Sequence, residues 1–267
     1  MGRRDTSALD VLRDMRRRVF YAFPDRLRSQ VASRLPDRAL LPEWRGKRYW
    51  DDLYGGPDRD PFRLDSTPDE HLKYAATLEL CGPGPFASAL EIGCSIGTFT
   101  ELLAPRCERL LATDISQDAV TTARERLVDQ SHVEIVAKDV TRDFPEGPFD
   151  LIVASDVLYY WTYGENVRVL AAMEAALHPG GALVLFHYVP RMGSVLNGTE
   201  VHDLIAAETN LTSVFADERE YGAGRLYRVD RYECAPALSD TLLGEARRQA
   251  LRVGDAAVRP PNGDRSA

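Results

Sequence analysis

A short stretch of the sequence, SALEIGCSIGTFTELL, combines an acidic residue with a glycine-containing loop. An apolar run ends at Glu91, the loop after it carries Gly93 and Gly97, and apolar residues then resume with helical spacing. In an open parallel sheet, a strand–loop–helix turn of this kind lies at the edge where ligands bind. The dinucleotide fingerprint G-x-G-x-x-G would require glycines at two positions that hold Ser95 and Thr98. We therefore do not expect pyrophosphate in this loop.

Acidic residues also follow the next two predicted strands. The stretch RLLATDIS reaches Asp114, where a carboxylate can accept hydrogen bonds from both hydroxyls of a ribose. Ile115, the next residue, can pack on the face of an adenine ring. In VEIVAKDV, Asp139 can accept a hydrogen bond from an adenine amino group, with Val140 beside it. Both acids at strand ends, after a glycine loop, predict a site for an adenosine-containing cofactor.

The sequence E-I-G-C-S-I-G resembles the first motif of the class I S-adenosylmethionine-dependent methyltransferases, D/E-x-G-x-G-x-G. Ser95 stands where that motif has its middle glycine, and it is small enough to let the backbone approach a ligand. The resemblance implies S-adenosylmethionine as the cofactor, with the negative charge of Glu91 near the ligand's cationic groups. The amides of the loop would then face the carboxylate of the methionine portion.

A longer set of motifs resembles the nodulation protein S group of methyltransferases. That group has a D-P-aromatic loop before a K-Y-A-x-T-L helix, and its glycine loop reads G-C-S-I-G. The corresponding stretches here are DPFRLDSTPDEHLKYAATLEL, the glycine loop and EGPFDLIVASDVLYY, so the resemblance spans roughly residues 58–190. The founding activity of the group is methylation of a sugar amine on a chito-oligosaccharide, while its relatives act on varied small molecules.

This resemblance implies a methyl transfer to an amine or hydroxyl of a small-molecule acceptor, with nitrogen favoured and an amino sugar or secondary metabolite as the substrate class. Carried over by position, the implied cofactor-binding residues are Glu91, Gly93, Cys94, Gly97, Asp114, Ile115, Asp139, Val140 and Ser155. Phe62 and Arg63 would form a lid over the cofactor, although the group commonly has Trp at position 62.

Residues after the fourth and fifth predicted strands are candidates for the acceptor side of the reaction. Methyl transfer is an in-line displacement, so the protein mainly aligns the reacting atoms, and a base can remove the acceptor's proton. We predict His187, at the end of LVLFHYVP, as the catalytic base; the alternative is a half-buried His bonded to the backbone. The substrate-binding candidates are Asp156, Tyr159, Tyr160 and Tyr188.

The elements that must position these residues alternate between strands and helices. The β-prone runs are Ala89–Ile92, Arg109–Thr113, Val133–Val136, Phe149–Ala154 and Ala182–His187, and the helical patterns among them are 98–104, 116–128 and about 165–177. Alternation of this kind predicts parallel pairing through right-handed crossovers. After a helix in EVHDLIAA, the stretch TSVFADEREYGAGRLYRVDRYEC predicts an antiparallel hairpin.

We therefore predict an α/β fold, a Rossmann-like doubly wound sheet of five parallel strands plus a C-terminal antiparallel hairpin. A helix in EHLKYAATLELC should precede the first strand, and the turn-forming residues 51–70 should form an irregular loop. The expected organisation is a basic helical extension over 1–48, a methyltransferase domain over 49–235, and a helix (239–253) with a disordered tail over 236–267.

The charge distribution narrows the class of partner. Residues 1–48 contain thirteen Arg or Lys and six Asp or Glu, whereas the rest of the chain contains twenty and thirty-five. An acidic body argues against a nucleic-acid groove. The basic N-terminal helix could contact a membrane surface or a polyanion, but we favour a helix that docks on the body or on a partner, including a second copy of the chain.

Three alternatives stay open on the sequence alone: a nicotinamide-dependent dehydrogenase, a methyltransferase acting on a nucleic acid or other macromolecule, and a non-catalytic partner that binds the same cofactor. The missing third glycine disfavours the first, and the acidic body disfavours the second. The four cysteines lie far apart, which predicts reduced thiols and no metal site. No apolar run is long enough to span a membrane, and no signal core is seen, so we expect a cytoplasmic bacterial protein.

Overall fold

The computed structural model describes residues 46–190, 196–221 and 224–236. The chain divides into two compact units, Met1–Ala235 and Pro236–Ala267, and all described residues except Pro236 belong to the first. The helices predicted within 1–48 and over 239–253 lie outside the described residues.

A seven-stranded sheet forms the centre of the first unit, with the strand order β3-β2-β1-β4-β5-β7-β6. Its strands are β1 (Ala89–Ile92), β2 (Leu110–Asp114), β3 (Val133–Ala137), β4 (Phe149–Ser155), β5 (Leu177–Tyr188), β6 (Thr212–Tyr221) and β7 (Arg225–Glu233). The first five strands pair in parallel, and β7 runs antiparallel to both β5 and β6. This arrangement confirms the predicted parallel sheet with its terminal hairpin.

The connection between β3 and β4 crosses back over the middle of the sheet. The chain moves outward from β1 to β2 and β3, and then returns to place β4 on the other side of β1. All four residues of β1 are buried, as expected for a central strand covered on both faces. The carboxyl ends of β1 and β4 therefore lie at the switch point, where open α/β sheets bind ligands.

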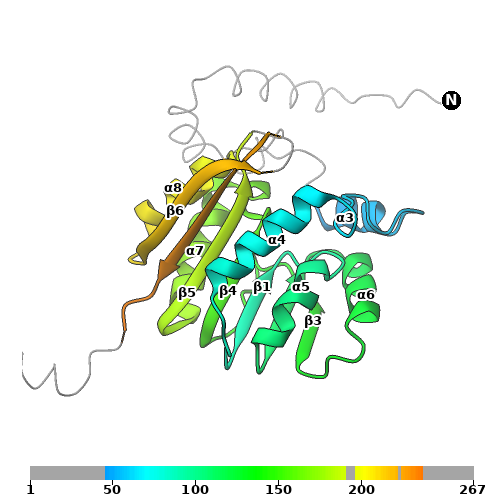
Figure 1. The fold of residues 1–267 in the computed structure, drawn as a ribbon, viewed down its shortest axis with the longest axis horizontal. Coiled ribbons are helices and arrows are strands. Elements are labelled where there is room, and N and C mark those ends of the chain that lie inside the picture. Colours follow the sequence, from blue (N-terminus) through cyan, green and yellow to red (C-terminus); the bar gives the residue numbers. More distant parts are fainter. Residues whose placement is uncertain (1–45, 191–195, 222–223, 237–267) are drawn as a thin grey trace, which may run out of the picture. The chain divides into compact units, whose positions relative to one another are not determined.

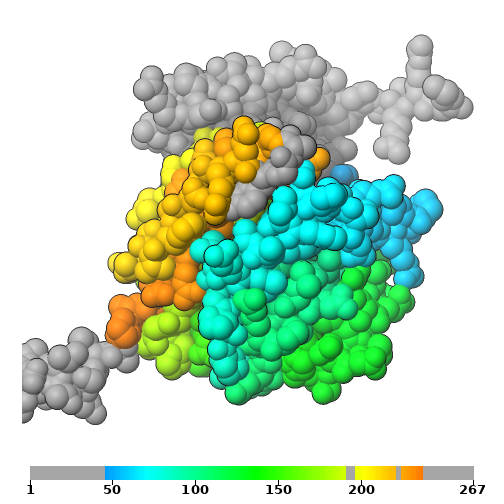
Figure 2. All heavy atoms as spheres, viewed as in Figure 1, coloured from blue at the N-terminus to red at the C-terminus, as the bar shows by residue number. Residues whose placement is uncertain are grey.

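Helices cover both faces of the sheet (Figure 1). The helices α4 (Pro68–Cys81), α5 (Thr98–Leu103) and α6 (Gln117–Arg126) share one hydrophobic core with the sheet, and α7 (Tyr163–Ala176) and α8 (Gly198–Glu208) share the other. Figure 2 shows α4 on the surface of its face, beside the orange strands of the β6–β7 hairpin. The short 3-10 turns η3 (Ala104–Arg106) and η4 (Leu158–Tyr160) complete these layers.

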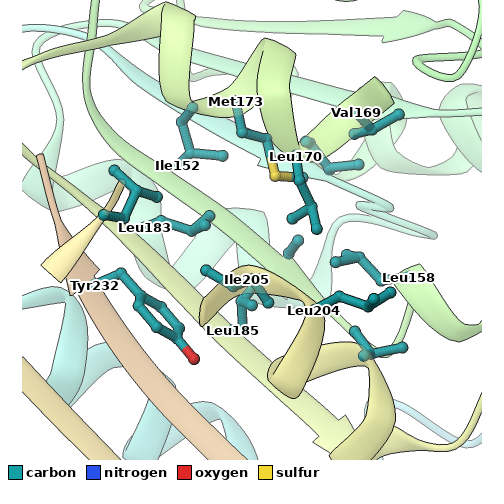
Figure 3. Packing of buried hydrophobic residues seen from close by; sticks show 14 of the residues in the cluster. Ile152, Leu158, Val169, Leu170, Met173, Leu183, Leu185, Leu204, Ile205 and Tyr232 are labelled. Atoms are coloured by element: carbon teal, nitrogen blue, oxygen red, sulfur yellow. The ribbon is translucent and has the colours of Figure 1, made fainter. Parts of the chain in front are cut away.

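The core under α7 and α8 is built mainly from apolar side chains of these two helices and of the sheet (Figure 3). It contains Val169, Leu170 and Met173 of α7, Leu204 and Ile205 of α8, and Ile152, Leu183 and Leu185 of the sheet. Side chains at helical spacing on α7 and α8 thus meet alternate residues of β4 and β5. Leu158, in the turn after β4, belongs to the same core, so this layer supports that turn.

One expectation from the sequence was wrong. The segment 51–70 was predicted as an irregular loop, but its first residues belong to the helix α3 (Lys47–Tyr54). Tyr49, Trp50, Leu53 and Tyr54 do stand at helical spacing within its eight residues, but the signal is short and the turn-forming residues from Gly55 onward follow it directly. Tyr54 is buried in a cluster with Ile96 and Ala119, which indicates that tertiary contacts hold α3 to the loop after β1 and to α6.

Candidate cofactor and acceptor site

A cavity of about 920 Å³ opens where the carboxyl ends of the parallel strands meet α3 and α4. Its size is at the upper end of the range for small-molecule sites. The predicted residues on its wall are Phe62, Glu91, Gly93, Cys94, Asp114, Ile115, Asp139, Val140, Ser155, Asp156, Tyr159, Tyr160 and Tyr188. The other three predicted residues, Arg63, Gly97 and His187, do not line it.

Gly93 gives the loop after β1 its sharp turn. Its φ is +80°, and the amides of Gly93 and Cys94 both donate to the carbonyl of Thr113, at 2.7 and 2.9 Å. A β-carbon at position 93 would lie 3.2 Å from two carbons of the Val157 side chain. The loop therefore folds back over the end of β2, and glycine keeps the approach to the neighbouring loop open.

Gly97 has a packing role that the motif alone does not reveal. It begins α5 in the left-handed conformation, with φ +81°. A β-carbon there would lie 2.9 Å from Leu127 Cδ1 and 3.0 Å from the β-carbon of Ala123. Because Gly97 faces α6 and not the cavity, its predicted contact with the cofactor does not fit this geometry.

Ser95 adopts a conformation that normally favours glycine. Its φ is +51°, in the left-handed region, which costs about 1 kcal/mol for a residue with a β-carbon. Its hydroxyl lies 2.7 Å from the hydroxyl of Tyr54, and its amide donates to Asp114 Oδ2 at 2.9 Å. The serine therefore adds a side-chain contact that the glycine of the general motif could not make.

Asp114 ends β2 with its carboxylate held by two backbone amides. Oδ2 accepts from the Ser95 amide and Oδ1 from the Ser116 amide, each at 2.9 Å. Burial raises the pKa of Asp114, while these amide hydrogen bonds act to lower it. Each carboxylate oxygen can accept a second hydrogen bond, so Asp114 can still receive two donors from a ligand.

Two buried oxygen atoms at the ends of the central strands have no close hydrogen-bond partner among the described residues. They are Glu91 Oε2, at the end of β1, and Ser155 Oγ, at the end of β4, whereas Glu70 Oε2, on the same cavity wall, is ion-paired with Lys73. Burial raises the pKa of Glu91 to about 7, although the nearby side chain of Thr100 acts to lower it. Buried polar atoms are normally paired. The two atoms therefore indicate that this part of the wall is built to meet a polar, positively charged group.

At the β3 end of the cavity, Asp139 follows the strand with one oxygen facing its own loop. Its Oδ1 accepts from the amide of Thr141 at 3.1 Å and from the hydroxyl of Thr141 at 2.6 Å. Oδ2 lies 3.2 Å from Nε of the exposed Arg142. Val140 is buried on the cavity wall.

The opposite end of the cavity holds a buried lysine between two carboxylates. Lys73, on α4, forms an ion pair with Glu70 one turn earlier, and its Nζ lies 3.0 Å from Asp156 Oδ2. Burial opposes the charge, but the neighbouring Asp156 and Glu70 raise the pKa of Lys73, so it stays protonated. All three side chains line the cavity.

Asp156 is fully engaged by protein donors. Its Oδ1 accepts from the Tyr159 hydroxyl at 3.0 Å and from the Tyr188 amide at 2.8 Å, and Oδ2 accepts from Lys73. Despite burial, the charge of Lys73 holds the pKa of Asp156 below its usual value. Asp156 thus ties together α4, the loop after β4 and the end of β5.

Aromatic rings line the opening between the two ends. The Trp50 ring on α3 meets the Tyr160 ring edge-on at 4.9 Å between centroids, and the Phe62 ring lies 6.3 Å from Trp50. Phe62 is 44% exposed, consistent with a place at the rim. Arg63 points elsewhere and lies 3.6 Å from Asp58, so its predicted place in a lid over the cofactor does not fit this geometry.

His187 is fully buried and does not face the cavity. Its Nε2 accepts from the amides of Leu158 and Val157, at 3.2 and 3.4 Å. Because amides donate to Nε2, the ring must carry its proton on Nδ1, which lies 3.0 Å from His202 Nε2. Both nitrogens are therefore occupied.

The contacts of His187 continue through the protein interior. His202 Nδ1 lies 3.0 Å from Asp230 Oδ2, and Asp230 also accepts from Arg228 and from the Tyr232 hydroxyl. Burial and the neighbouring His202 lower the pKa of His187 to about 3. The prediction of His187 as the catalytic base does not fit this geometry, because the ring is sealed from the cavity and holds the loop after β4.

The sequence reasoning missed several residues of the cavity wall. They are Trp50 and Tyr54 of α3, Glu70, Lys73 and Tyr74 of α4, and Arg225 and Tyr227 of β7. A signal was available for one group, since Glu70 stands one helical turn before Lys73, the first residue of the K-Y-A-x-T-L motif. No described helix is long and apolar enough to cross a membrane.

Comparison with known sequences places these features in a family. The model of the family described as nodulation protein S (NodS) matches residues 56–186. Nodulation protein S of Rhizobium tropici is 42% identical over 127 residues, which are 47% of this chain and 53% of that protein. The protein of the same name from Bradyrhizobium diazoefficiens is 42% identical over 119 residues, or 44% and 54% of the two chains. The chain thus spans about half the length of these curated relatives.

Solved structures give a match over more of the chain. The N-methyltransferase NodS from Bradyrhizobium japonicum WM9, crystallised with S-adenosyl-L-homocysteine, is 30% identical, with a TM-score of 0.64. The match covers 70% of this chain and 97% of that one. This likeness confirms the predicted class I methyltransferase fold. The chain belongs to the nodulation protein S family.

Proposed function

We propose that this protein transfers the methyl group of S-adenosylmethionine to an amine of a small molecule. The observation that carries the proposal is the meeting of three strand-end acids, Glu91, Asp114 and Asp139, on the wall of one cavity. The NodS N-methyltransferase crystallised with S-adenosyl-L-homocysteine supports the same cofactor and the preference for nitrogen. An amino sugar or a secondary metabolite is the acceptor class we favour.

The residues present fit this cofactor at both of its ends. Glu91 offers a buried carboxylate on the cavity wall to the ammonium of the methionine portion, and Ser155 offers a buried hydroxyl that has no partner among the described residues. Asp114 has free acceptor positions for the two ribose hydroxyls, with Ile115 next to it for the adenine ring. Asp139 lies on the wall beyond them, where the adenine amino group would lie.

S-adenosylmethionine supplies a methyl group on a sulfonium, whose thioether is a good leaving group. The protein's own part is to hold the acceptor in line and to receive its proton. Lys73 and Asp156 fix the geometry of the end of the cavity opposite Asp139, where we place the acceptor, and the rings of Tyr159 and Tyr160 line that end. Glu70, also on the wall of this end, forms an ion pair with Lys73.

The test of the proposal is calorimetric titration of the purified protein with S-adenosyl-L-homocysteine, with NAD as the control ligand. Micromolar binding of the first and none of the second is expected. Such a result justifies an assay of methyl transfer to a panel of acceptors, beginning with amino sugars. Absence of S-adenosyl-L-homocysteine binding would contradict the proposal.

The variant Asp114→Ala should weaken S-adenosyl-L-homocysteine binding roughly 100-fold, because two hydrogen bonds to a carboxylate are lost. The matched control is Asp129→Ala, an exposed carboxylate that does not line the cavity. The control should bind the ligand as the wild type does. Circular dichroism of both variants checks that the fold is kept, and an unchanged affinity in Asp114→Ala would remove Asp114 from the site.

A further inference from the structure

Two side chains of α3 contact the two serines that flank Asp114 in space. The Tyr54 hydroxyl lies 2.7 Å from Ser95 Oγ. Asp51 Oδ1 accepts from Ser116 Oγ at 3.1 Å and from the Gln117 amide at 2.9 Å. Asp51 and Tyr54 stand three residues apart, so they share one face of the helix.

The same two serines hold Asp114 through their backbones. The Ser95 amide donates to one oxygen of the carboxylate and the Ser116 amide to the other. Ser95 belongs to the loop after β1, and Ser116 begins α6 as its N-cap. Each serine therefore joins α3 by its side chain and Asp114 by its amide.

We propose that α3 positions the carboxylate of Asp114 for the cofactor's ribose, with Tyr54 and Asp51 as positioning residues that act through Ser95 and Ser116. This inference rests on the proposed function, because it assumes a ribose at Asp114. Two amides, one on each oxygen, fix the plane of the carboxylate. The outward acceptor positions of both oxygens are then left for two neighbouring hydroxyls.

The conformation of Ser95 supports a role for its side chain. A glycine would adopt φ +51° without strain, yet the chain has a serine whose hydroxyl meets Tyr54. Tyr54 is 6% exposed and Asp51 is half-buried, so water does not replace these contacts freely. Hydrogen bonds from Lys47, Gln117 and Ser116 hold the pKa of Asp51 below its usual value, although partial burial acts to raise it.

The experiment compares two ligands across three variants. The ligands are S-adenosyl-L-homocysteine and its 2′,3′-dideoxy analogue, which lacks both ribose hydroxyls. The variants are Tyr54→Phe, Asp51→Asn and the control Asp52→Asn, an exposed carboxylate on the same helix. We expect Tyr54→Phe and Asp51→Asn each to weaken binding of S-adenosyl-L-homocysteine, the natural ligand, about fivefold. Binding of the analogue should be unchanged. Asp52→Asn should change neither.

Equal weakening of both ligands would overturn the inference, because α3 would then only stabilise the cavity. In a protein that already carries Asp114→Asn, Tyr54→Phe should have less effect on the natural ligand, and a full fivefold loss there would also overturn it. If Tyr54→Phe fails to fold, Ser95→Ala removes the same contact from the other side, and the same ligand comparison applies. Wild-type protein that binds neither ligand would instead overturn the proposed function.

Discussion

Two carboxylates at the same edge of the sheet have different surroundings. Asp114 ends β2 and receives two amide donors, one on each oxygen. Asp156 follows β4 and receives an ammonium, a phenol and an amide. Burial raises the pKa of Asp114, whereas the charge of Lys73 outweighs burial and lowers that of Asp156. The first carboxylate is held but open to a ligand, and the second is an anchor.

The comparison extends to a third buried carboxylate, Asp230 of β7, which is paired with His202 of α8. Asp230 lies among His202, Arg228 and Tyr232 and is fully buried. Like Asp156, it is satisfied by protein donors, and its pKa is lowered despite burial. The difference is that Asp156 lines the cavity and Asp230 does not. Cavity exposure and free acceptor positions, taken together, separate a binding carboxylate from a structural one.

The largest effect on stability should come from removing Lys73, the cation that pairs with Asp156. Lys73→Met would leave Glu70 and Asp156 facing each other without a buried cation, and breaking a buried pair in this way costs about 3–5 kcal/mol. Denaturant unfolding should show this loss of stability. Asp114→Asn, measured alongside, should lose far less stability while binding S-adenosyl-L-homocysteine poorly.

A double variant provides the control for this difference. If the loss in Lys73→Met comes from an unpaired charge, adding Asp156→Asn should recover part of it, because the second substitution removes one of the two carboxylates. Equal destabilisation by Lys73→Met and Asp114→Asn would contradict the distinction between the anchor and the binding carboxylate.

A smaller effect is expected at the histidine that holds the loop after β4. His187→Ala should destabilise the protein by about 2–3 kcal/mol, since two amides of Val157 and Leu158 lose their buried acceptor. Turnover should fall more than affinity for S-adenosyl-L-homocysteine, because the loop carries Tyr159 and Tyr160 of the acceptor end.

The variant His187→Gln distinguishes anchoring from proton transfer. Its side-chain oxygen can accept a hydrogen bond from the loop, but an amide cannot act as a base at neutral pH. Steady-state kinetics with His187→Gln should therefore recover part of the turnover lost in His187→Ala. Turnover as low as in the alanine variant, with the fold intact, would favour a catalytic His187 after all.

Much of the fold and of the cofactor end could be predicted from the sequence. Short apolar runs alternating with helical patterns predict parallel strands, and parallel strands share the edge at which they end. Acids placed directly after those runs, such as Asp114 and Asp139, must therefore lie near one another. Local sequence is sufficient here because the course of the backbone alone determines where these acids lie.

The acceptor end was less predictable because side-chain direction and distant contacts determine it. His187 and Tyr188 were both assigned to the acceptor side, yet successive residues of a strand point to opposite faces. Tyr188 lines the cavity, so His187 faces α8. Tyr54 and Lys73 contact residues 41 and 83 positions away, and no local pattern encodes such contacts.

The last prediction concerns the charge of Glu91. Burial raises its pKa to about 7 from an ordinary value of 4.5, so the free protein holds a proton there below neutral pH. A ligand ammonium favours the ionised form, and binding must therefore release this proton. Affinity for S-adenosyl-L-homocysteine should be constant above about pH 7 and fall as the pH drops toward 5, by at most about tenfold per pH unit.

Calorimetry in buffers of different ionisation enthalpy measures the released proton directly at pH 6, and Glu91→Gln should show neither the release nor the pH dependence.

The stability of the unliganded protein gives an independent test of the raised pKa of Glu91. Between pH 4.5 and 7 the unfolded chain has ionised Glu91 while the folded protein still holds its proton, so this group lowers stability as the pH rises. Glu91→Gln should then be more stable than the wild type above pH 7. A less stable Glu91→Gln would mean that Glu91 is anchored as Asp156 is, and the comparison between open and satisfied carboxylates would fail at β1.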